Sequence, residues 1–338
     1  MAATKRDCRH PGAGAKGGIM DIDQPLSRKP VDGRAALLMV GLCAIWGMQQ
    51  TALKAAAPDM APVLQISLRS GIAALFIAAL VFMRKEGHAL RGGTWKAGLA
   101  IGALFALEYL FMGEGLRFTS ASHMGIFLYT APIFTALGLH FRVPEERLSP
   151  LQWLGIAAAF GGVAVSFLGG GADGPRRDSA WIGDLMGIGA GAAWGATTLT
   201  LRFSRLSQAP SSVTTLYQLL GAFVLLGLLA VGTGQTYARP TMLLGVSMVF
   251  QVVFMSLISL LVWFGLLRVY LASRLGVLSF MTPLFGVLFG VVLLGERLDA
   301  AFIAGALMVL AGILLVSGHE IFKARKARRA QTVLIDPA

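Results

Sequence analysis

Ten apolar stretches of roughly 20 residues run along the chain, and they restrict its fold more than any other feature. In the first half they cover Ala35–Ala56, Pro62–Met83, Trp95–Leu116, Ala121–Phe141 and Leu151–Gly169. In the second half they cover Trp181–Leu201, Val213–Gly232, Met242–Leu267, Ala272–Leu294 and Ala300–Gly318. A helix of that length can cross about 30 Å of hydrocarbon. The stretches therefore predict an all-α integral membrane protein with ten transmembrane helices.

The composition supports this interpretation. Hydrophobic residues make up 56% of the chain and charged residues 14%, whereas soluble domains carry about 25% charged residues. The surplus of apolar side chains has to face lipid. The segments 1–34 and 319–338 are basic and are predicted to be cytoplasmic tails; the first is rich in Gly and Pro, which predicts disorder rather than a cleavable signal peptide. Cys8 and Cys43, in the first tail and in a span, predict no disulfide.

Basic residues are distributed unevenly between the two ends of these stretches. With the N-terminus inside and residues near span ends counted with the adjacent side, 22 Lys and Arg residues fall on its side of the membrane and six on the opposite side, and Arg69 alone lies deep within a span. The positive-inside rule therefore predicts a multi-pass topology with both termini cytoplasmic. The net charge of +12 does not indicate a nucleic-acid partner, because the cations are spread over many loops. Contact of the tails with anionic lipid is a secondary expectation.

The second half of the chain repeats motifs of the first about 150 residues later. Trp46-Gly47 returns as Trp194-Gly195, and Pro132 returns as Pro283. Glu146-Arg147-Leu148, with Gly155 and Gly162 behind it, returns as Glu296-Arg297-Leu298 with Gly305 and Gly312. Because each half carries five spans, an odd number, the second copy has to enter the membrane from the opposite side. The sequence predicts two inverted five-helix repeats, 35–170 and 181–318.

These motifs resemble the EamA-type transporters of the drug/metabolite transporter superfamily. The resemblance rests on the Trp-Gly pairs, Arg69, Pro132, Pro283 and the Gly-Glu-Arg-Leu at 295–298, and it covers Leu37 to Ser317. It implies a ten-helix inverted-repeat carrier, a permease in a bacterial cytoplasmic (inner) membrane that exports amino acids or other small metabolites.

Three residues depart from the pattern. Glu145-Glu146-Arg147 lacks the Gly of its later counterpart, and Gln218 stands where the repeat would place a second Arg69. Glu108 is an acid at a position where an uncharged residue is expected. This last departure leaves the coupling mechanism open.

A polar stripe beside a tryptophan occurs in both halves. Trp46, Gln49 and Gln50 share one helix face at i, i+3 and i+4, and Trp194, Thr197 and Thr198 occupy the corresponding positions. Polar side chains are costly toward lipid, so they either line a cavity or join helices through hydrogen bonds. The repetition near mid-membrane favours a cavity.

Arg69 and Glu108 are expected at a similar depth in neighbouring helices. A lone charge there costs several kcal/mol, so pairing is the natural expectation. Three roles stay open: a permanent ion pair, a substrate site in which Arg69 takes a carboxylate and Glu108 an amine, and proton coupling through Glu108. Gln65 shares the face of Arg69 four residues earlier and is expected to extend the site.

Pro132 and Pro283 are expected near the middle of the fourth and ninth spans, where each removes a backbone hydrogen bond. They are candidate hinges; the alternative is a static kink that improves packing. Four residues lie within one turn of these prolines and are expected to face the same cavity: Tyr129, Thr130, Ser279 and Thr282. His123 and His140, near helix ends, are expected to be hydrogen-bonded without a role in function.

The predicted substrate site gathers polar and aromatic side chains from both halves. Its residues are Trp46, Gln49, Gln50, Gln65, Arg69, Glu108, Tyr109, Tyr129, Trp194, Thr198, Gln218, Trp263 and Ser279. The aromatic members are compatible with aromatic amino acids as substrates. The partners expected are therefore a small molecule, the bilayer and, if transport is coupled, a proton.

Other classes of protein are less compatible with the sequence. The five histidines are scattered and no HExxH or similar spacing occurs, so an enzyme, a catalytic residue, a metal site or a cofactor is not predicted. An uncoupled facilitator or channel of the same fold stays open. The ladder Gly183, Gly187, Gly191 and Gly195 is expected to pack helices within one subunit, so a monomer is predicted.

Overall fold

The computed structural model describes residues 32–91, 93–144, 147–168, 179–270, 275 and 278–316. The predicted tails, apart from 32–34, lie outside these residues. The first half contains α1 (Gly33–Ala55), α2 (Pro62–Met83), α3 (His88–Arg91), α4 (Trp95–Gly115), α5 (Ala121–Leu128), α6 (Ala131–Arg142) and α7 (Pro150–Leu168). The second half contains α8 (Ala180–Arg202), η3 (Arg205–Gln208), α9 (Ser211–Gly232), α10 (Met242–Val249), the π-helix η4 (Phe250–Ile258), α11 (Ser259–Val269), η5 (Ser279–Met281), α13 (Thr282–Leu294) and a last helix, Ala300–Val316. The prediction of an all-helical chain is confirmed.

Several helices begin at the residues that local chemistry favours. Asp32 caps α1 by accepting a hydrogen bond from the backbone N–H of Ala35 at 2.8 Å. Ser120 caps α5 and Thr241 caps α10 in the same way. Pro62 stands in the first turn of α2, where its missing N–H costs nothing.

The helices have the length and surface of membrane spans. Within the described residues, six helical segments are long and apolar enough to cross a membrane: α1, α2, α4, α5 together with α6, α9, and Met242–Trp263. Shorter apolar helices cover Pro150–Ser166, Ser279–Leu294 and Ala300–Val316, and α8 equals α1 in length at 23 residues. Large side chains such as Leu75, Leu228 and Val292 are exposed on these helices, as expected where the solvent is lipid.

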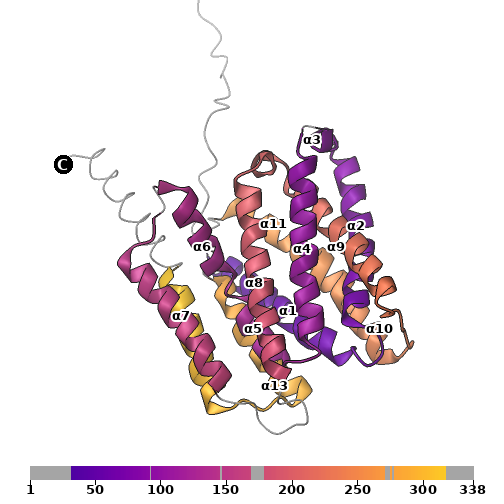
Figure 1. Ribbon diagram of the computed structural model, residues 1–338. Coiled ribbons are helices and arrows are strands. Elements are labelled where there is room, and N and C mark those ends of the chain that lie inside the picture. Colours follow the sequence, from indigo (N-terminus) through magenta and orange to yellow (C-terminus); the bar gives the residue numbers. More distant parts are fainter. Residues whose placement is uncertain are drawn as a thin grey trace, which may run out of the picture.

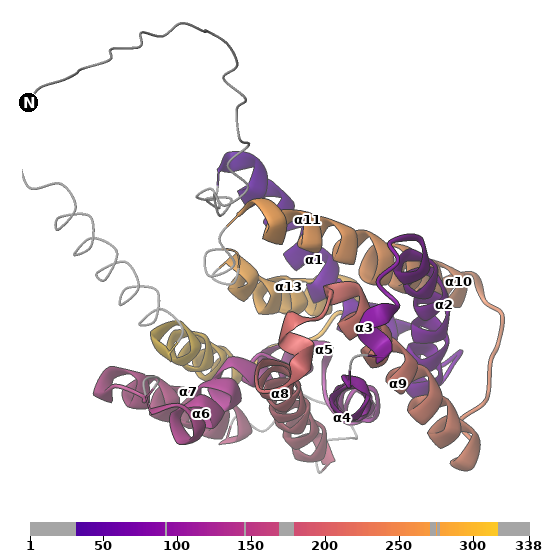
Figure 2. The same ribbon diagram turned by 90° about the horizontal axis from the view of Figure 1, so that it is seen from above.

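The helices form one bundle in which elements from the two halves alternate. Figure 1 shows α2, α4 and α9 side by side, with α3 joining α2 to α4 at one end. In the view from above, α1, α11 and α13 form one side of the bundle and α6 and α7 lie at the opposite edge from α2 and α10 (Figure 2). The short α5 lies in the interior, where it packs against both α8 and α13.

Hydrogen bonds fix the direction of the helices. We call the end of the bundle at which α1 begins the Gly33 side and the end at which α1 terminates the Ala55 side. On the Ala55 side, Lys54 bonds to the carbonyl of Thr119 in the α4–α5 turn and to Glu296 after α13. On the Gly33 side, Tyr270 after α11 donates to Asp32 before α1 at 2.9 Å.

The contacts between helices are reciprocal between the two halves. The Trp-Gly helix α1 packs on the proline-bearing α13, and its counterpart α8 packs on the proline-bearing α6. Likewise α4 packs on α8 and α9, while η4 packs on the corresponding α1 and α2. The helices α2 and α9, which occupy equivalent places, pack on each other. Such reciprocity is what a two-fold relation between the halves produces.

The repeated glycines lie where helices from different halves approach most closely. A Cβ on Gly47 would come within 2.7 Å of the Cβ of Phe285, and a Cβ on Gly195 within 2.8 Å of the Cβ of Phe134. A Cβ on Gly155 or Gly162 would meet the carbonyl of Gly312 or Gly305 in the last helix, at 2.9 and 2.5 Å. The ladder from Gly183 to Gly195 faces the α4–α5 turn, α5 and α6, so it packs helices of this chain.

The fourth and ninth spans are broken rather than kinked. The expectation that Pro132 and Pro283 lie near the middle of continuous helices is corrected, because each stands in the first turn of a new helix, α6 or α13. Tyr129 and Thr130 separate α5 from α6, and η5 precedes α13. A proline cannot supply the N–H that the preceding turn needs, so the chain restarts its helix there.

Candidate functional site

A central cavity of about 460 Å³ lies between the two halves. Twelve of the thirteen residues predicted for the substrate site line it: Trp46, Gln49, Gln50, Arg69, Glu108, Tyr109, Tyr129, Trp194, Thr198, Gln218, Trp263 and Ser279. Thr197 also lines it. Both polar stripes beside tryptophans therefore face one space, which is the arrangement that their repetition suggested.

Gln65 does not line this cavity, which corrects its predicted place in the site. Its amide donates to the carbonyl of Met60 at 2.8 Å and accepts from the amide of Gln251 at 3.0 Å. Gln251 in turn bonds to Ser247, and Ser247 to the carbonyl of Ala52. The side chain is fully buried in a network that joins α1, α2 and the α10–η4 helix near the Ala55 side.

Aromatic rings line the cavity in two edge-to-face pairs. The rings of Trp46 and Trp263 meet edge to face with centroids 5.5 Å apart, and those of Tyr129 and Trp194 do the same at 5.5 Å. Edge-to-face pairs hold each ring in one orientation. The two tryptophans of the repeat are thus both fixed by an aromatic partner beside the same space.

Arg69 and Glu108 are the two charged residues among those lining the cavity. The guanidinium of Arg69 lies over the ring of Tyr109, 4.7 Å from its centroid, and its Nη1 has no hydrogen-bond partner. The Oε2 of Glu108 is equally without a partner. Although both side chains are described by the structure, no ion pair joins them within 4.0 Å. A permanent ion pair, one of the predicted alternatives, is therefore absent from this conformation.

The hydroxyl groups on the cavity wall are mostly satisfied by their own helices. Thr197 donates to the carbonyl of Ala193 at 2.9 Å, Thr198 to that of Trp194 at 3.1 Å, and Ser256 to that of Gln251 at 2.9 Å. Hydroxyls bonded in this way tolerate an apolar environment. Among the lining residues, the buried side-chain atoms without a hydrogen-bond partner are Nη1 of Arg69, Oε2 of Glu108 and the hydroxyl of Thr282.

Irregular helices bring several lining residues that the sequence analysis did not include in the site. The break before α6 places Leu128 at the cavity beside Tyr129, which the sequence analysis did include, and the break before α13 places there Ser279 and Thr282, two residues expected at the cavity because they lie close to Pro283. The π-helix η4 contributes Met255 and Ser256, and π-helical turns are frequent at functional sites.

One sequence signal was available for part of this set. Ser256, Ser259 and Trp263 follow a spacing of i, i+3 and i+7, which places them on one helical face. Phe105, Leu128, Leu201, Thr215, Leu219 and Met255 also line the cavity. Apolar members of that list have no feature that separates them from side chains facing lipid.

The cavity is displaced toward the Gly33 side. Leu201 near the end of α8, Thr215 near the start of α9 and Trp263 in α11 all line it and all lie toward that side. On the Ala55 side, hydrogen bonds join the halves across the bundle. Asp59 accepts from the N–H of Arg239 at 2.8 Å, and Glu114 accepts from Gln235 at 2.8 Å.

Glu296 is the centre of these bonds on the Ala55 side. Its carboxylate accepts from the N–H of Ala121 at 2.6 Å, from the N–H and hydroxyl of Ser122 at 3.0 and 2.6 Å, and from Lys54 at 3.4 Å. Although burial raises the pKa of Glu296, the Ser122 hydroxyl, the Lys54 ammonium and the two backbone N–H groups together hold it below its usual value. The carboxylate thus remains charged and caps the start of α5.

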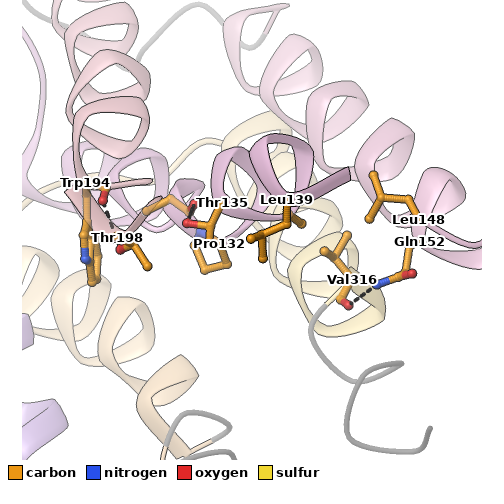
Figure 3. A pocket seen from close by; sticks show the side chains of 10 residues that line it. Pro132, Thr135, Leu139, Leu148, Gln152, Trp194, Thr198 and Val316 are labelled. Carbon is orange, nitrogen blue, oxygen red and sulfur yellow. Dashed lines mark hydrogen bonds between the residues drawn. The ribbon is translucent and has the colours of Figure 1, made fainter. Parts of the chain in front are cut away.

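A second cavity of about 370 Å³ lies beside the first, between α6, α7, α8 and the last helix. It shares Trp194 and Thr198 with the central cavity and extends past Pro132 and Leu139 to Gln152 and Val316 (Figure 3). Its polar side chains are bonded: Gln152 donates to the carbonyl of Val316 at 3.1 Å and Thr135 to that of Ala131 at 3.0 Å. The side of α6 that lines this cavity is largely apolar.

In the part of the chain that the structure describes, no three His, Cys, Asp or Glu side chains gather as metal ligands would.

Comparisons with known proteins agree with this architecture. The sequence model of the EamA-like transporter family matches residues 33–168 and again 181–318. The chain is 24% identical over 287 residues to the uncharacterized transporter YoaV of Bacillus subtilis, which covers 83% of this chain and 96% of that protein. It is 26% identical over 318 residues to a probable amino-acid metabolite efflux pump of Salmonella typhimurium, which covers 90% of this chain and 99% of the relative.

A solved crystal structure is similar in fold. It matches with a TM-score of 0.57 and 21% identity over 84% of this chain and 96% of the other. At that identity the likeness concerns the fold alone. The structure and the relatives together describe a multi-pass integral membrane protein with bacterial transporters among its homologues.

Proposed function

Because the chain belongs to the EamA-like transporter family, we propose that it is a secondary transporter that exports amino acids or related zwitterionic metabolites by alternating access. It is a permease of the bacterial cytoplasmic membrane with both termini in the cytoplasm, and it acts as a monomer without a cofactor or an enzymatic activity. The efflux named for the Salmonella relative supports the direction. The uneven distribution of basic residues supports the topology.

The observation that carries the proposal is the pair of unpartnered charges in the central cavity. Arg69 and Glu108 both line this cavity, Nη1 of the one and Oε2 of the other have no hydrogen-bond partner, and no ion pair joins the two side chains. Buried hydrogen-bonding atoms without partners are costly, so a ligand that satisfies both is favoured. An α-amino acid carries a carboxylate for Arg69 and an ammonium group for Glu108. The aromatic walls then accommodate its side chain.

The reciprocal contacts support alternating access. Two half-structures related by a two-fold axis in the membrane plane can exchange their conformations around one site. The Ala55 side is closed by bonds between the halves, whereas the cavity extends toward the Gly33 side. This conformation corresponds to an inward-facing carrier, because the Gly33 side carries the basic, cytoplasmic loops.

Export by cells and uptake into inverted membrane vesicles test the proposed site. We expect Arg69→Gln and Glu108→Gln each to reduce export of the recognised amino acid by at least about tenfold, because each removes a charge-assisted bond worth about 1.5–3 kcal/mol. Resistance of overexpressing cells to toxic amino-acid analogues identifies the substrate, and radiolabelled uptake into inverted vesicles measures the rate.

Matched variants separate binding from folding. Lys96→Gln removes an exposed charge on the helix that carries Glu108, and Arg84→Gln removes an exposed charge directly after the helix that carries Arg69; both lie outside the cavity lining. These variants should transport like the parent protein. Normal transport by well-folded Arg69→Gln and Glu108→Gln proteins would show that the site assignment is wrong.

An uncoupled facilitator is the alternative within the same fold. Transport that continues unchanged after the proton gradient is collapsed would favour it. Accumulation against a concentration gradient that disappears with the proton gradient would instead identify a coupled carrier.

A further inference from the structure

A buried histidine–aspartate pair lies on the Ala55 side, outside the lining of both cavities. His123 on α5 and Asp184 on α8 face each other, with the Nδ1 of the imidazole 3.0 Å from Oδ2 and 3.1 Å from Oδ1. The side chain of Asp184 is 4% exposed and that of His123 17% exposed. The pair therefore joins the two halves of the chain at a place with little access to water.

The surroundings hold the imidazole in place. Its ring stacks on the ring of Phe302 in the last helix, with centroids 4.0 Å apart and planes 8° from parallel. Phe127 meets it edge to face at 5.8 Å. Because both neighbouring rings are apolar, the imidazole of His123 has Asp184 as its side-chain hydrogen-bond partner among the described residues.

The charge of Asp184 has no Lys or Arg partner among the described residues. Its hydrogen bonds come from the hydroxyl of Thr119 and from His123. Two other charges lie close by through shared neighbours: Lys54 bonds to the carbonyl of Thr119, and Glu296 bonds to Ser122 beside His123. Those two pair with each other at 3.4 Å.

We propose that the His123–Asp184 pair binds a proton that holds the Ala55 side closed. With a neutral imidazole the pair carries one negative charge in an apolar place; with a protonated imidazole it is an ion pair without net charge. A net charge out of water is costly, whereas a hydrogen-bonded pair is tolerated. Opening the Ala55 side has to separate bonds between the halves, of which this is one, and it exposes Asp184 to water. Proton binding therefore favours the closed form and proton release the open form.

This inference rests on the proposed alternating access and adds a site at which outside pH regulates it. Its test uses a single cysteine at Leu128, a cavity residue, in the full chain with Cys8 and Cys43 replaced. Sealed, right-side-out vesicles are labelled from outside with an impermeant maleimide at pH 5.5 and 8. Each rate is divided by that of the unfolded protein at the same pH, which removes the intrinsic reactivity of the thiol.

We expect labelling in the parent protein to be about fivefold or more faster at pH 8 than at pH 5.5, the size of a typical coupling between two sites. His123→Gln and Asp184→Asn should each reduce this ratio to near one. His140→Gln, which alters a histidine on the Gly33 side that accepts from the N–H of Leu148, should keep it. Two variants are used so that a folding defect in one leaves the other decisive.

Different outcomes separate the two claims. Labelling that is independent of pH in the parent but responds to a transported amino acid leaves alternating access intact and overturns the proton site. A ratio unchanged by both His123→Gln and Asp184→Asn overturns it as well. Labelling that responds to neither pH nor substrate contradicts alternating access and the inference together.

Discussion

Two glycines determine how closely the helices that carry the cavity tryptophans approach their neighbours. Gly47 follows Trp46 and lies against Phe285, while Gly195 follows Trp194 and lies against Phe134. Because glycine has no side chain, the backbones of α1 and α8 at Trp46 and Trp194 can approach α13 and α6 closely, and this close packing fixes both tryptophans at the cavity. The same physical requirement explains why the Trp-Gly pair occurs in both copies.

Gly47→Ala should destabilise the protein by about 1–3 kcal/mol, because its methyl group would force α1 away from α13. Gly41→Ala is the matched control on the same helix, where a Cβ meets nothing within 4 Å. It should leave stability unchanged or raise it slightly, since Ala favours helix. Thermal unfolding of the detergent-purified proteins measures both; equal midpoints for the two variants would contradict the packing argument.

Broken helices are the elements that distinguish this bundle from a simple set of spans. Both breaks precede a proline, and both bring residues to the cavity, Tyr129 in one half and Thr282 in the other. Irregular backbone within a membrane is tolerated where it lines a cavity or is buried in protein. The second cavity beside Pro132 leaves α6 room to move relative to α8. These features support the proposal that the two prolines act as hinges.

Pro132→Ala and Pro283→Ala test the hinges. A continuous helix resists bending at the former break, so we expect a maximal export rate reduced several-fold with little change in the concentration at half-maximal rate. Pro62→Ala is the control, because that proline starts a continuous helix. Concentration-dependent export measures both parameters. A higher substrate concentration at half-maximal rate, with an unchanged maximal rate, would assign the prolines to binding instead.

Much of this element-level description was accessible from sequence, because apolar length and repeated motifs report directly on spans. The polar and aromatic members of the cavity were accessible for a related reason: Arg69, Glu108 and the glutamines are costly toward lipid, so they indicate the interior. Gln65 shows the limit of that argument, since an inward polar side chain equally well serves a structural network.

Other features depend on tertiary contacts that a single sequence does not display. The π-helix η4 and the breaks before α6 and α13 arise where the surrounding helices compensate unsatisfied backbone groups. The contact of His123 with Asp184 joins residues 61 positions apart on different halves. Neither residue shows a local pattern that would identify the other as its partner.

Glu296 links three parts of the molecule on the side that is closed. It joins the turn after α13 to the start of α5 and to Lys54 at the end of α1. Because its pKa is held below the usual value, its contribution to stability is present above about pH 4.5, the value of a free glutamate, and is lost as the pH falls through its lower native pKa.

Glu296→Gln should therefore lower the unfolding free energy by about 1–3 kcal/mol at pH 7, the usual worth of bonds to a charged group. The difference from the parent should shrink below pH 4.5, where the native carboxylate takes up its proton. Lys54→Gln should keep the pH dependence, because three donors from Ala121 and Ser122 remain. Thermal midpoints across pH 3.5 to 7 measure the effect, and a gap that stays constant over this range would disprove it.

The reciprocal contacts between the halves also set the order in which the chain can be completed during synthesis. A ribosome delivers α1 and α2 long before α13 and α9, the helices on which they pack. Until then Gly47 of α1 lacks the α13 residues against which it packs, and Arg69 and Glu108 lack the second-half residues of the cavity. The nascent first half therefore waits in the insertion machinery or against lipid with its binding groups uncovered. The cavity is among the last features to be assembled. A truncated chain that ends after α7 contains only the lining residues of the first half, such as Arg69 and Glu108.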